Sequence, residues 1–195
     1  MKLIGSNVKS AAGLLLVALA ALLLAAASNT LADRAADKLD YIHRNGQKPH
    51  PDSHPAELTE DEINAYFASG RVKLPAGVKS VRVTGASGAI TGKARVDFDQ
   101  VKSGRGNSNP LLSLFSGVHD IVVDAEASGF NYHGHVHVNS VAIDGVEVPH
   151  FALELFVEKY VTPKYPGVGL DSTFRLPDKI ETATVGEHEL TIMQR

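Results

Sequence analysis

The alternation of apolar and polar residues constrains the fold of this chain more than any other feature. Apolar side chains recur at every second position in segments around residues 81–84, 90–99, 121–128 and 133–138. Successive side chains of a strand point to opposite faces, so this period of two predicts long antiparallel strands with one solvated face. The inward positions are often small, which leaves room on that face for a helix or for a ligand: Gly92, Ala94, Ala125 and Ala127.

A helix is predicted directly before the strands. Thr59 and Glu62 have the spacing of a capping box, in which each side chain accepts a hydrogen bond from the other residue's amide. Three acidic residues in the first turn favour the positive end of the helix. Ser69 and Gly70 are expected to end it.

A second helix is predicted after the strands. It begins at Pro149, and its broad apolar stripe continues until Pro163 stops it. A strand over residues 172–176 and a hairpin from Ile180 to Met193 are expected to follow. The alternation and the two helices together predict one α+β domain over residues 56–195, with the helices against the apolar face of the sheet.

The N-terminus has the layout of a secretory signal. Lys2 and Lys9 precede a run of Ala, Gly, Leu and Val over residues 11–27, which ends in three alanines. This order of charged, apolar and small residues predicts a signal peptide over residues 1–27, with an uncleaved N-terminal membrane anchor as the alternative. Both place the rest of the chain outside the cytoplasm, in the periplasm or outside the cell, with inner-membrane attachment if the segment is uncleaved.

Residues 28–55 are expected to connect this leader to the domain. Residues 28–44 are compatible with a helical stalk, but their apolar period is too short to predict a core helix. Three prolines and a glycine between Asn45 and Pro55 are typical of a linker, here one that also contains His50 and His54.

The composition argues against several functions. Nineteen Lys and Arg against 22 Asp and Glu give a net charge of −3, which disfavours nucleic acid as a partner. The absence of Cys excludes a disulfide scaffold, thiolate metal ligands and a thiol nucleophile. No phosphate-binding loop, nucleophile elbow or zinc-protease motif is found, although residue order leaves a Ser-His-Asp triad open. The residues alone therefore assign neither a catalytic group nor a cofactor.

A strand of alternating His and Val over residues 133–138 is the one constellation of metal-ligating residues worth weighing. A hairpin turning at Phe130 and Asn131 would set His135 opposite Glu126 and His137 opposite Asp124. Ordinary His–carboxylate pairing on a solvated face is the favoured interpretation, so no metal is assigned. A zinc site is the alternative, and its candidate ligands are His135, His137, Asp124 and Glu126.

The segment Leu58–Phe67, placed before long strands, resembles the first helix of bacterial tubular lipid-binding-like (TULIP-like) envelope domains. The run Phe174–Pro177 and the final hairpin are similar to the same group, so the resemblance covers roughly residues 56–195. The chain lacks the lipidated cysteine of lipoprotein members. The resemblance implies a curved antiparallel sheet packed around or against the two amphipathic helices, no catalysis, and an apolar groove for acyl chains lined by Ile63, Phe67, Phe98, Val123, Val136, Phe151, Leu155 and Phe156.

The expected function is therefore that of an exported cell-envelope protein that binds a hydrophobic ligand, a lipid or another apolar small molecule, without catalysis. Two alternatives stay open. The chain can be a structural or interaction domain with a filled core and a protein partner, or a zinc-binding protein that uses the histidine strand.

Overall fold

The computed structural model of the chain describes residues 30–103, 116–163 and 166–195. The expected leader, residues 1–27, lies outside the described residues. Across these three ranges, no helix combines the length and the hydropathy needed to cross a membrane.

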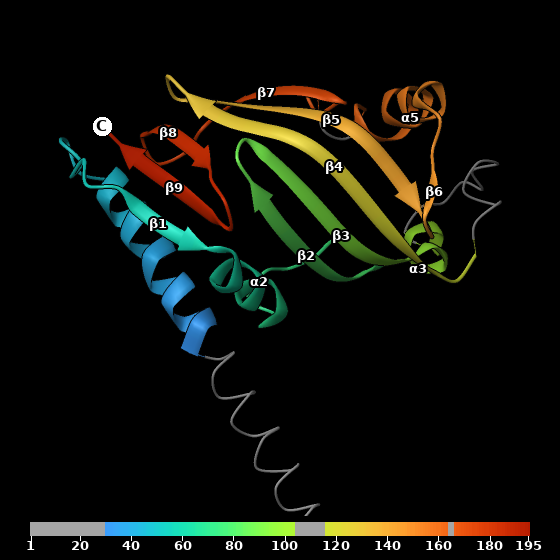
Figure 1. The fold of residues 1–195 in the computed structure, drawn as a ribbon, viewed down its shortest axis with the longest axis horizontal. Coiled ribbons are helices and arrows are strands. Elements are labelled where there is room, and N and C mark those ends of the chain that lie inside the picture. Colours follow the sequence, from blue (N-terminus) through green and yellow to red (C-terminus); the bar gives the residue numbers. More distant parts are fainter. Residues whose placement is uncertain (1–29, 104–115, 164–165) are drawn as a thin grey trace, which may run out of the picture.

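The chain has an α+β fold, in which a nine-stranded antiparallel sheet is accompanied by a few short helices (Figure 1). The predicted fold class is confirmed at this level, but the sheet is not strongly curled. The strands are β1 (Ala56–Thr59), β2 (Val78–Ala86), β3 (Ala89–Asp97), β4 (Val118–Phe130), β5 (His133–Ile143), β6 (Val146–Glu147), β7 (Asp171–Arg175), β8 (Ile180–Val185) and β9 (Glu189–Gln194).

Strand β4 is the point at which the sheet divides. One edge of β4 pairs with β3 from Val118 to Glu126 and then with β8 at Ser128 and Gly129. The other edge pairs with β5. Strands β3 and β2 therefore form one branch of the sheet, and β8, β9 and β1 form the other (Figure 1).

The predicted alternation of faces is confirmed in β2 to β5. The register places Val81 opposite Ala94, and Ala94 opposite Ile121, so this row shares one face of the sheet. We call this face, which also carries Val123 and Val136, the apolar face. The three side chains of the row are only half-buried, which shows that the apolar face is incompletely covered on this branch.

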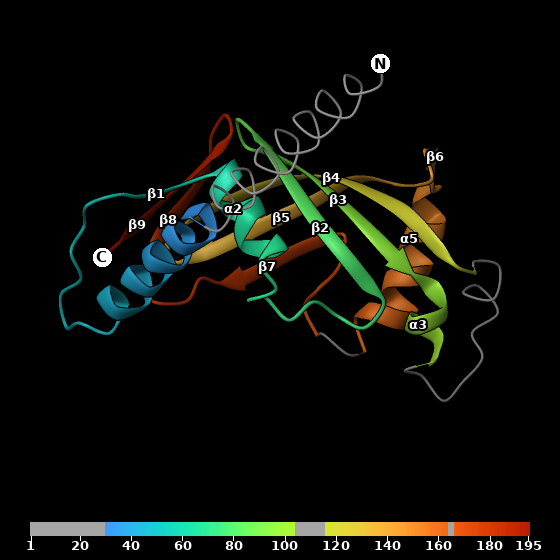
Figure 2. The ribbon, with the colours of Figure 1, turned by 90° about the horizontal axis from the view of Figure 1, so that it is seen from below.

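The helices lie at the two ends of the sheet. Residues 30–46 are helical, and α2 (Glu60–Ala68) follows β1. At the other end are α3 (Phe98–Ser103) and α5 (His150–Phe156), which continues as the π-helical turn η1 (Val157–Val161) (Figure 2). The predicted capping box of Thr59 and Glu62 is present at the start of α2.

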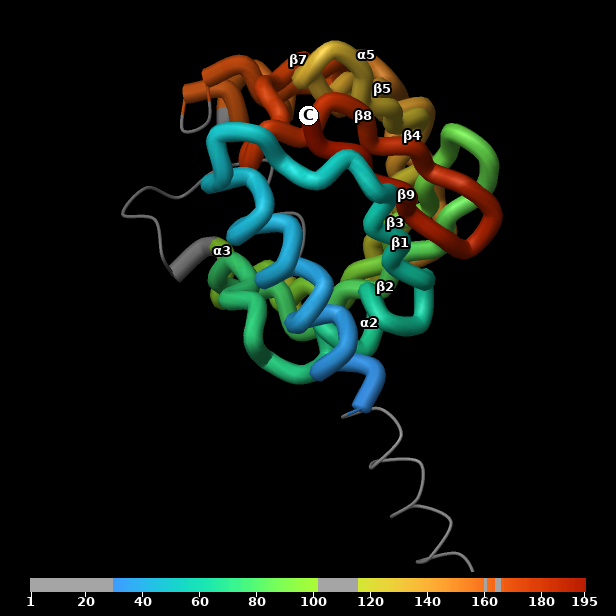
Figure 3. Tube along the Cα trace, turned by 90° about the vertical axis from the view of Figure 1, so that its left-hand side faces the viewer, coloured from blue at the N-terminus to red at the C-terminus, as the bar shows by residue number. Residues whose placement is uncertain are grey.

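The helix over residues 30–46 packs into the core instead of standing apart as a stalk. Ile42 is 4 % exposed and packs with Leu58, Ile180 and Ile192 of β1, β8 and β9. Figure 3 shows this helix beside the strands of that branch. The small residues Ala32 and Ala35 of this helix are also buried. A narrow apolar stripe is therefore enough to pack the helix against the sheet.

A buried amide pair fixes the end of this helix to the last strand. The Asn45 side chain donates to Gln194 Oε1 at 2.9 Å and to the Asp52 carbonyl at 2.8 Å. Gln194 in turn donates to the carbonyls of Ile42 and Asp178. The expected linker after Asn45 is thus tied back to the fold at Asp52.

The second helix differs from its prediction. None of the residues of α5 is buried, and Phe151 and Leu155 are 66 % and 55 % exposed. The broad apolar stripe is real, but it does not pack on the apolar face. Because the sheet is not strongly curled, it does not wrap around this helix.

The predicted register of the β4–β5 hairpin is also wrong. The turn residues are Asn131 and Tyr132, with φ of 51° and 67°, as a two-residue hairpin turn with positive φ requires. Glu126 therefore faces His137, and Ala127 faces Val136. From Ala125 to Phe130 the partners shift by two positions, which keeps these side chains on their predicted faces. The register shifts by one further residue between Asp124 and Ala125.

Replacing Ile42 by Ala is expected to lower the free energy of unfolding by about 2–4 kcal/mol, because it leaves a cavity among buried side chains. Asp40→Ala, on the exposed side of the same helix, is the control and should change stability by less than about 0.5 kcal/mol. Urea unfolding measures both. An unchanged midpoint for Ile42→Ala would mean that this helix is not part of the cooperative core.

The branch point predicts a contrast between two glycines of the apolar face. A Cβ at Gly129 would lie 2.8 Å from the Ala183 Cβ and 2.9 Å from the Ala183 nitrogen, whereas a Cβ at Gly92 meets nothing closer than 3.9 Å. Gly129→Ala should therefore destabilise the protein by about 1–3 kcal/mol. Gly92→Ala should be tolerated. Thermal unfolding measures both variants, and equal decreases in melting temperature would contradict the close approach of Gly129 and Ala183 at the branch point.

Candidate apolar binding groove

The incompletely covered part of the apolar face forms a groove of about 760 Å³. Its floor is the apolar row Val81, Ala94 and Ile121 on β2, β3 and β4. The two adjacent rows of the sheet also contribute to the lining and include charged residues: Ser80, Arg95 and Asp120 on one side, and Arg82, Lys93 and Val122 on the other. One wall comes from α2 and the chain that follows it, which contribute Phe67, Val72 and Leu74. The small Ala94 side chain at the centre of the floor adds to the depth of the groove.

The α2 wall is held by polar contacts to the outer edge of β2, which pairs with no strand in the part of the chain that the structure describes. Asn64 is buried, and its side-chain amide both donates to the Val83 carbonyl and accepts from the Val83 amide, each at 2.8 Å. Glu60 accepts from the Gly85 amide at 3.2 Å. These contacts replace the hydrogen bonds of a neighbouring strand and fix α2 along the groove.

A buried carboxylate joins α2 to the helix over residues 30–46. Glu62 is 3 % exposed and accepts from Lys38 Nζ at 2.7 and 3.0 Å and from the Thr59 amide at 3.0 Å. Burial alone would raise the pKa of Glu62, but these hydrogen bonds and the positive charges of Lys38 and Arg34 outweigh it and hold the pKa below its usual range. The carboxylate is therefore ionised at neutral pH and fixes the angle between the two helices.

The turn between β8 and β9 closes the far end of this wall. His188 Nδ1 contacts Glu60 Oε2 at 2.7 Å, the His188 amide donates to the Gly85 carbonyl, and the Glu60 amide donates to the His188 carbonyl. The hydrogen bond and the charge of Glu60 raise the pKa of His188, and the hydrogen bond from His188 lowers the pKa of Glu60. This His188–Glu60 pair links the two branches of the sheet.

Of the eight residues expected to line a groove, Phe67 alone lies in this one. Ile63 packs at the margin of the main core instead. Val123 and Val136 share the apolar face but lie outside the groove lining. Phe98 is buried on α3, where its ring meets His119 edge-on with centroids 5.4 Å apart.

The three expected lining residues of the second helix do not reach the groove. Phe151 and Leu155 are exposed, and Phe156 is half-buried. The helix that carries them lies at the end of the sheet away from α2 and the helix over residues 30–46 (Figures 1 and 2).

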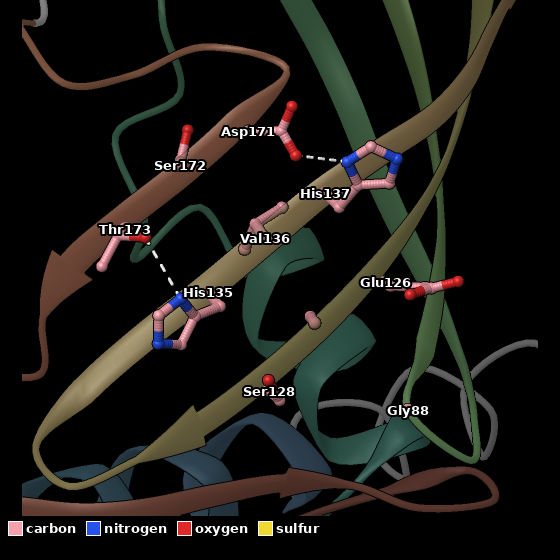
Figure 4. A pocket seen from close by; sticks show the side chains of 10 residues that line it. Gly88, Glu126, Ser128, His135, Val136, His137, Asp171, Ser172 and Thr173 are labelled. Atoms are coloured by element: carbon pink, nitrogen blue, oxygen red, sulfur yellow. Dashed lines mark hydrogen bonds and ion pairs between the residues drawn. The ribbon is translucent and has the colours of Figure 1, made fainter.

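The histidine strand lines a separate, polar pocket of about 280 Å³ on the opposite face (Figure 4). His137 Nδ1 contacts Asp171 Oδ1, and His135 Nδ1 lies 3.1 Å from Thr173 Oγ1. The hydrogen bond to Asp171 and its negative charge raise the pKa of His137. Because the hydroxyl and the carboxylate contact different imidazoles, this pocket does not assemble a hydroxyl–imidazole–carboxylate relay.

The candidate metal ligands do not converge. The second ring nitrogens of His135 and His137 point away from each other (Figure 4). Asp124 accepts from Thr91 and Ser140 hydroxyls, and Glu126 faces His137 across the strands. In the ranges that the structure describes, no group of three or more His, Cys, Asp and Glu side chains can hold a metal ion.

Sequence reasoning found one wall residue of the groove, Phe67, and placed the floor residues on the apolar face without assigning them to the groove. The alternation predicted that Val81, Ala94 and Ile121 point to the apolar face, and the small Ala94 indicated free space there. Val72 and Leu74 alternate with polar residues as in a strand, but they lie in the irregular connection after α2, and this pattern does not indicate that they line a groove. Comparison with known protein families, curated proteins and solved structures finds no match for this chain. The function is therefore argued from this geometry.

The His188–Glu60 pair predicts a pH dependence of stability. A raised folded-state pKa of His188 stabilises the fold fully below the unfolded value of about 6.5, and this stabilisation is lost as pH rises through the folded pKa. The lowered pKa of Glu60 acts in the other direction, so its stabilisation is lost only as pH falls through that folded value. We therefore expect the melting temperature to fall between about pH 6 and about pH 8.5.

His188→Gln should reduce this fall without removing it, because the pKa values of His54, His119 and His137 are also raised by paired carboxylates. Parallel melting curves at the two pH values measure the difference. A wild-type-like fall in the variant would show that the pair does not contribute to stability.

Proposed function

We propose that this protein is exported to the cell envelope and binds an apolar ligand, the hydrocarbon chain of a lipid, in the groove on the apolar face without chemical conversion. The observation that carries the proposal is the groove of about 760 Å³ over Val81, Ala94 and Ile121. Its volume lies within the range of about 300–1,000 Å³ that is usual for small-molecule sites.

The physical argument is the removal of apolar surface from water. The side chains of the floor are half-buried, and the wall beside them is fixed by Asn64 and Glu60 before any ligand arrives. A hydrocarbon chain in the groove would cover both surfaces, with a gain of about 25 cal/mol for each Å² of apolar area buried. A preformed wall lowers the ordering cost of binding.

The charged, apolar and small-residue order of residues 1–27 supports the export part of the proposal. The TULIP-like resemblance supports the lipid part, with a smaller site than a sheet curled around a helix would provide. In this proposal α2 is the helix that shapes the site, whereas α5 serves another purpose.

A second candidate function is favoured by the surface of α5 and its neighbour β6. Val146, Phe151 and Leu155 are 71 %, 66 % and 55 % exposed. Exposed apolar side chains of this size favour contact with another protein, as in an interaction domain. Leu155→Ser should abolish such contact and leave groove binding unchanged.

The groove is tested with Ala94→Phe and the fluorescent hydrocarbon diphenylhexatriene, which has no polar group. The new ring would fill the floor and displace about 60 Å² of ligand contact, so the affinity should fall about 10-fold. Fluorescence titration of the purified full chain measures the dissociation constant.

Ala142→Phe is the matched control, because Ala142 is also a half-buried alanine of the sheet but lies on the opposite face. It should bind the probe as the wild type does, and circular dichroism verifies that both variants fold. Equal affinities of the two variants, or no probe binding by the wild type, would overturn the proposal.

A further inference from the structure

The outer edge of β2 presents backbone polar groups to the groove. In an antiparallel pair, alternate residues direct both the amide and the carbonyl away from the partner strand. Val83 and Gly85 do so, because their groups are bonded to Asn64, Glu60 and His188. Val81 lies two residues before Val83, and the ladder with β3 is regular between them. Its amide and carbonyl therefore point to the same edge.

Val81 differs from these two residues in having no partner at this edge. Among the described residues, no hydrogen bond reaches its outward amide or carbonyl. Val81 is half-buried and forms part of the groove floor. A donor and an acceptor are thus held about 7 Å along the strand from the Asn64 site, beside an apolar surface. A ligand that covers this surface has to satisfy both groups, because burying them unpaired is unfavourable.

The protein itself shows which chemical group fits such an edge. Asn64 places a primary amide on Val83, with its NH₂ donating to the carbonyl and its oxygen accepting from the amide, both at 2.8 Å. A primary amide is complementary to this edge because its oxygen and one N–H lie on the same side of one planar group, so they can bond the amide and the carbonyl of a single residue. A carboxylate or an ester offers acceptors only and would leave the Val81 carbonyl unpaired.

We propose that the backbone of Val81 is the polar anchor of the groove and that the ligand is a primary acyl amide, an amphiphile with a –CONH₂ group at the head of its hydrocarbon chain. This inference rests on the proposed function and names its ligand class. The chain lies over Ala94 and Ile121, and the amide sits on Val81 as Asn64 sits on Val83. The polar anchor and the apolar floor together select the ligand.

Displacement of diphenylhexatriene by three ligands with the same hydrocarbon chain tests the anchor. Palmitamide, a primary amide, can both donate and accept on one side of its amide plane, whereas methyl palmitate and N,N-dimethylpalmitamide can only accept. We expect the first to displace the probe at about 10-fold lower concentration than either of the others. Equal potency of the three ligands, with the probe still bound by the wild type, would overturn the amide anchor and leave the groove proposal standing.

Val81→Pro provides the matching change in the protein. It removes the outward amide hydrogen at an edge position where proline is compatible with a strand and keeps an apolar side chain of similar size. Displacement by palmitamide, corrected for the affinity of this variant for diphenylhexatriene, should weaken about 10-fold, and the probe affinity itself reports how far the substitution alters the groove. Unchanged displacement in this variant would contradict the role of Val81.

A short unacylated peptide with alternating valines is the final competitor. Peptide-strand addition to β2 would use the same backbone groups. No displacement by the peptide is expected at concentrations where the acyl amide acts. Displacement by the peptide and not by the acyl amide would overturn the proposal in favour of strand addition.

Discussion

The branching of the sheet at β4 is the constraint on which the rest of the structure depends. One edge of this strand serves two partners in succession, β3 and then β8, and Gly129 makes the second pairing possible by letting Ala183 approach closely. The branch through β8, β9 and β1 is sealed by the helix over residues 30–46 around Ile42. The described part of that helix lies beside this branch (Figure 3), and the apolar face of β2 to β4 keeps a groove.

Helix α2 gives the groove its shape because polar contacts fix it from three sides. Asn64 satisfies the edge of β2, Glu62 joins Lys38 of the preceding helix, and Glu60 joins His188 of the last hairpin. Each contact places a side chain where a neighbouring strand or a packed layer would otherwise be needed. The wall of the groove is therefore ordered without being part of a filled core, as a binding site requires.

The sequence predicts the local features well because short-range patterns determine them. The alternation of β2 to β5, the capping box at Thr59 and the last hairpin are all present. The core role of Ile42 was missed because its partners Leu58 and Ile180 are distant in the sequence. The exposure of Phe151 was missed because helical amphipathicity indicates an apolar face but not what covers it.

The same limit applies to the candidate site. Periodicity predicts that Ala94 points to the apolar face, but the depth of the groove depends on where α2 and Leu74 lie in space. The metal hypothesis depended on the register of the β4–β5 hairpin. Because the turn lies at Asn131 and Tyr132, each histidine faces a residue of β4 two positions away from its predicted partner. A register error of two residues leaves each side chain on the same face of the sheet but changes the residue opposite it. Such an error therefore alters a predicted metal site far more than a predicted fold.

The central claim is that the uncovered branch of the sheet holds an apolar guest, and native mass spectrometry of the full chain extracted gently from cells tests it most directly. The account predicts a stoichiometric excess of one lipid-sized molecule, which is lost on denaturation, passes into organic solvent and is absent from Ala94→Phe. A bare polypeptide mass for the wild type, or the same excess in both proteins, would contradict it.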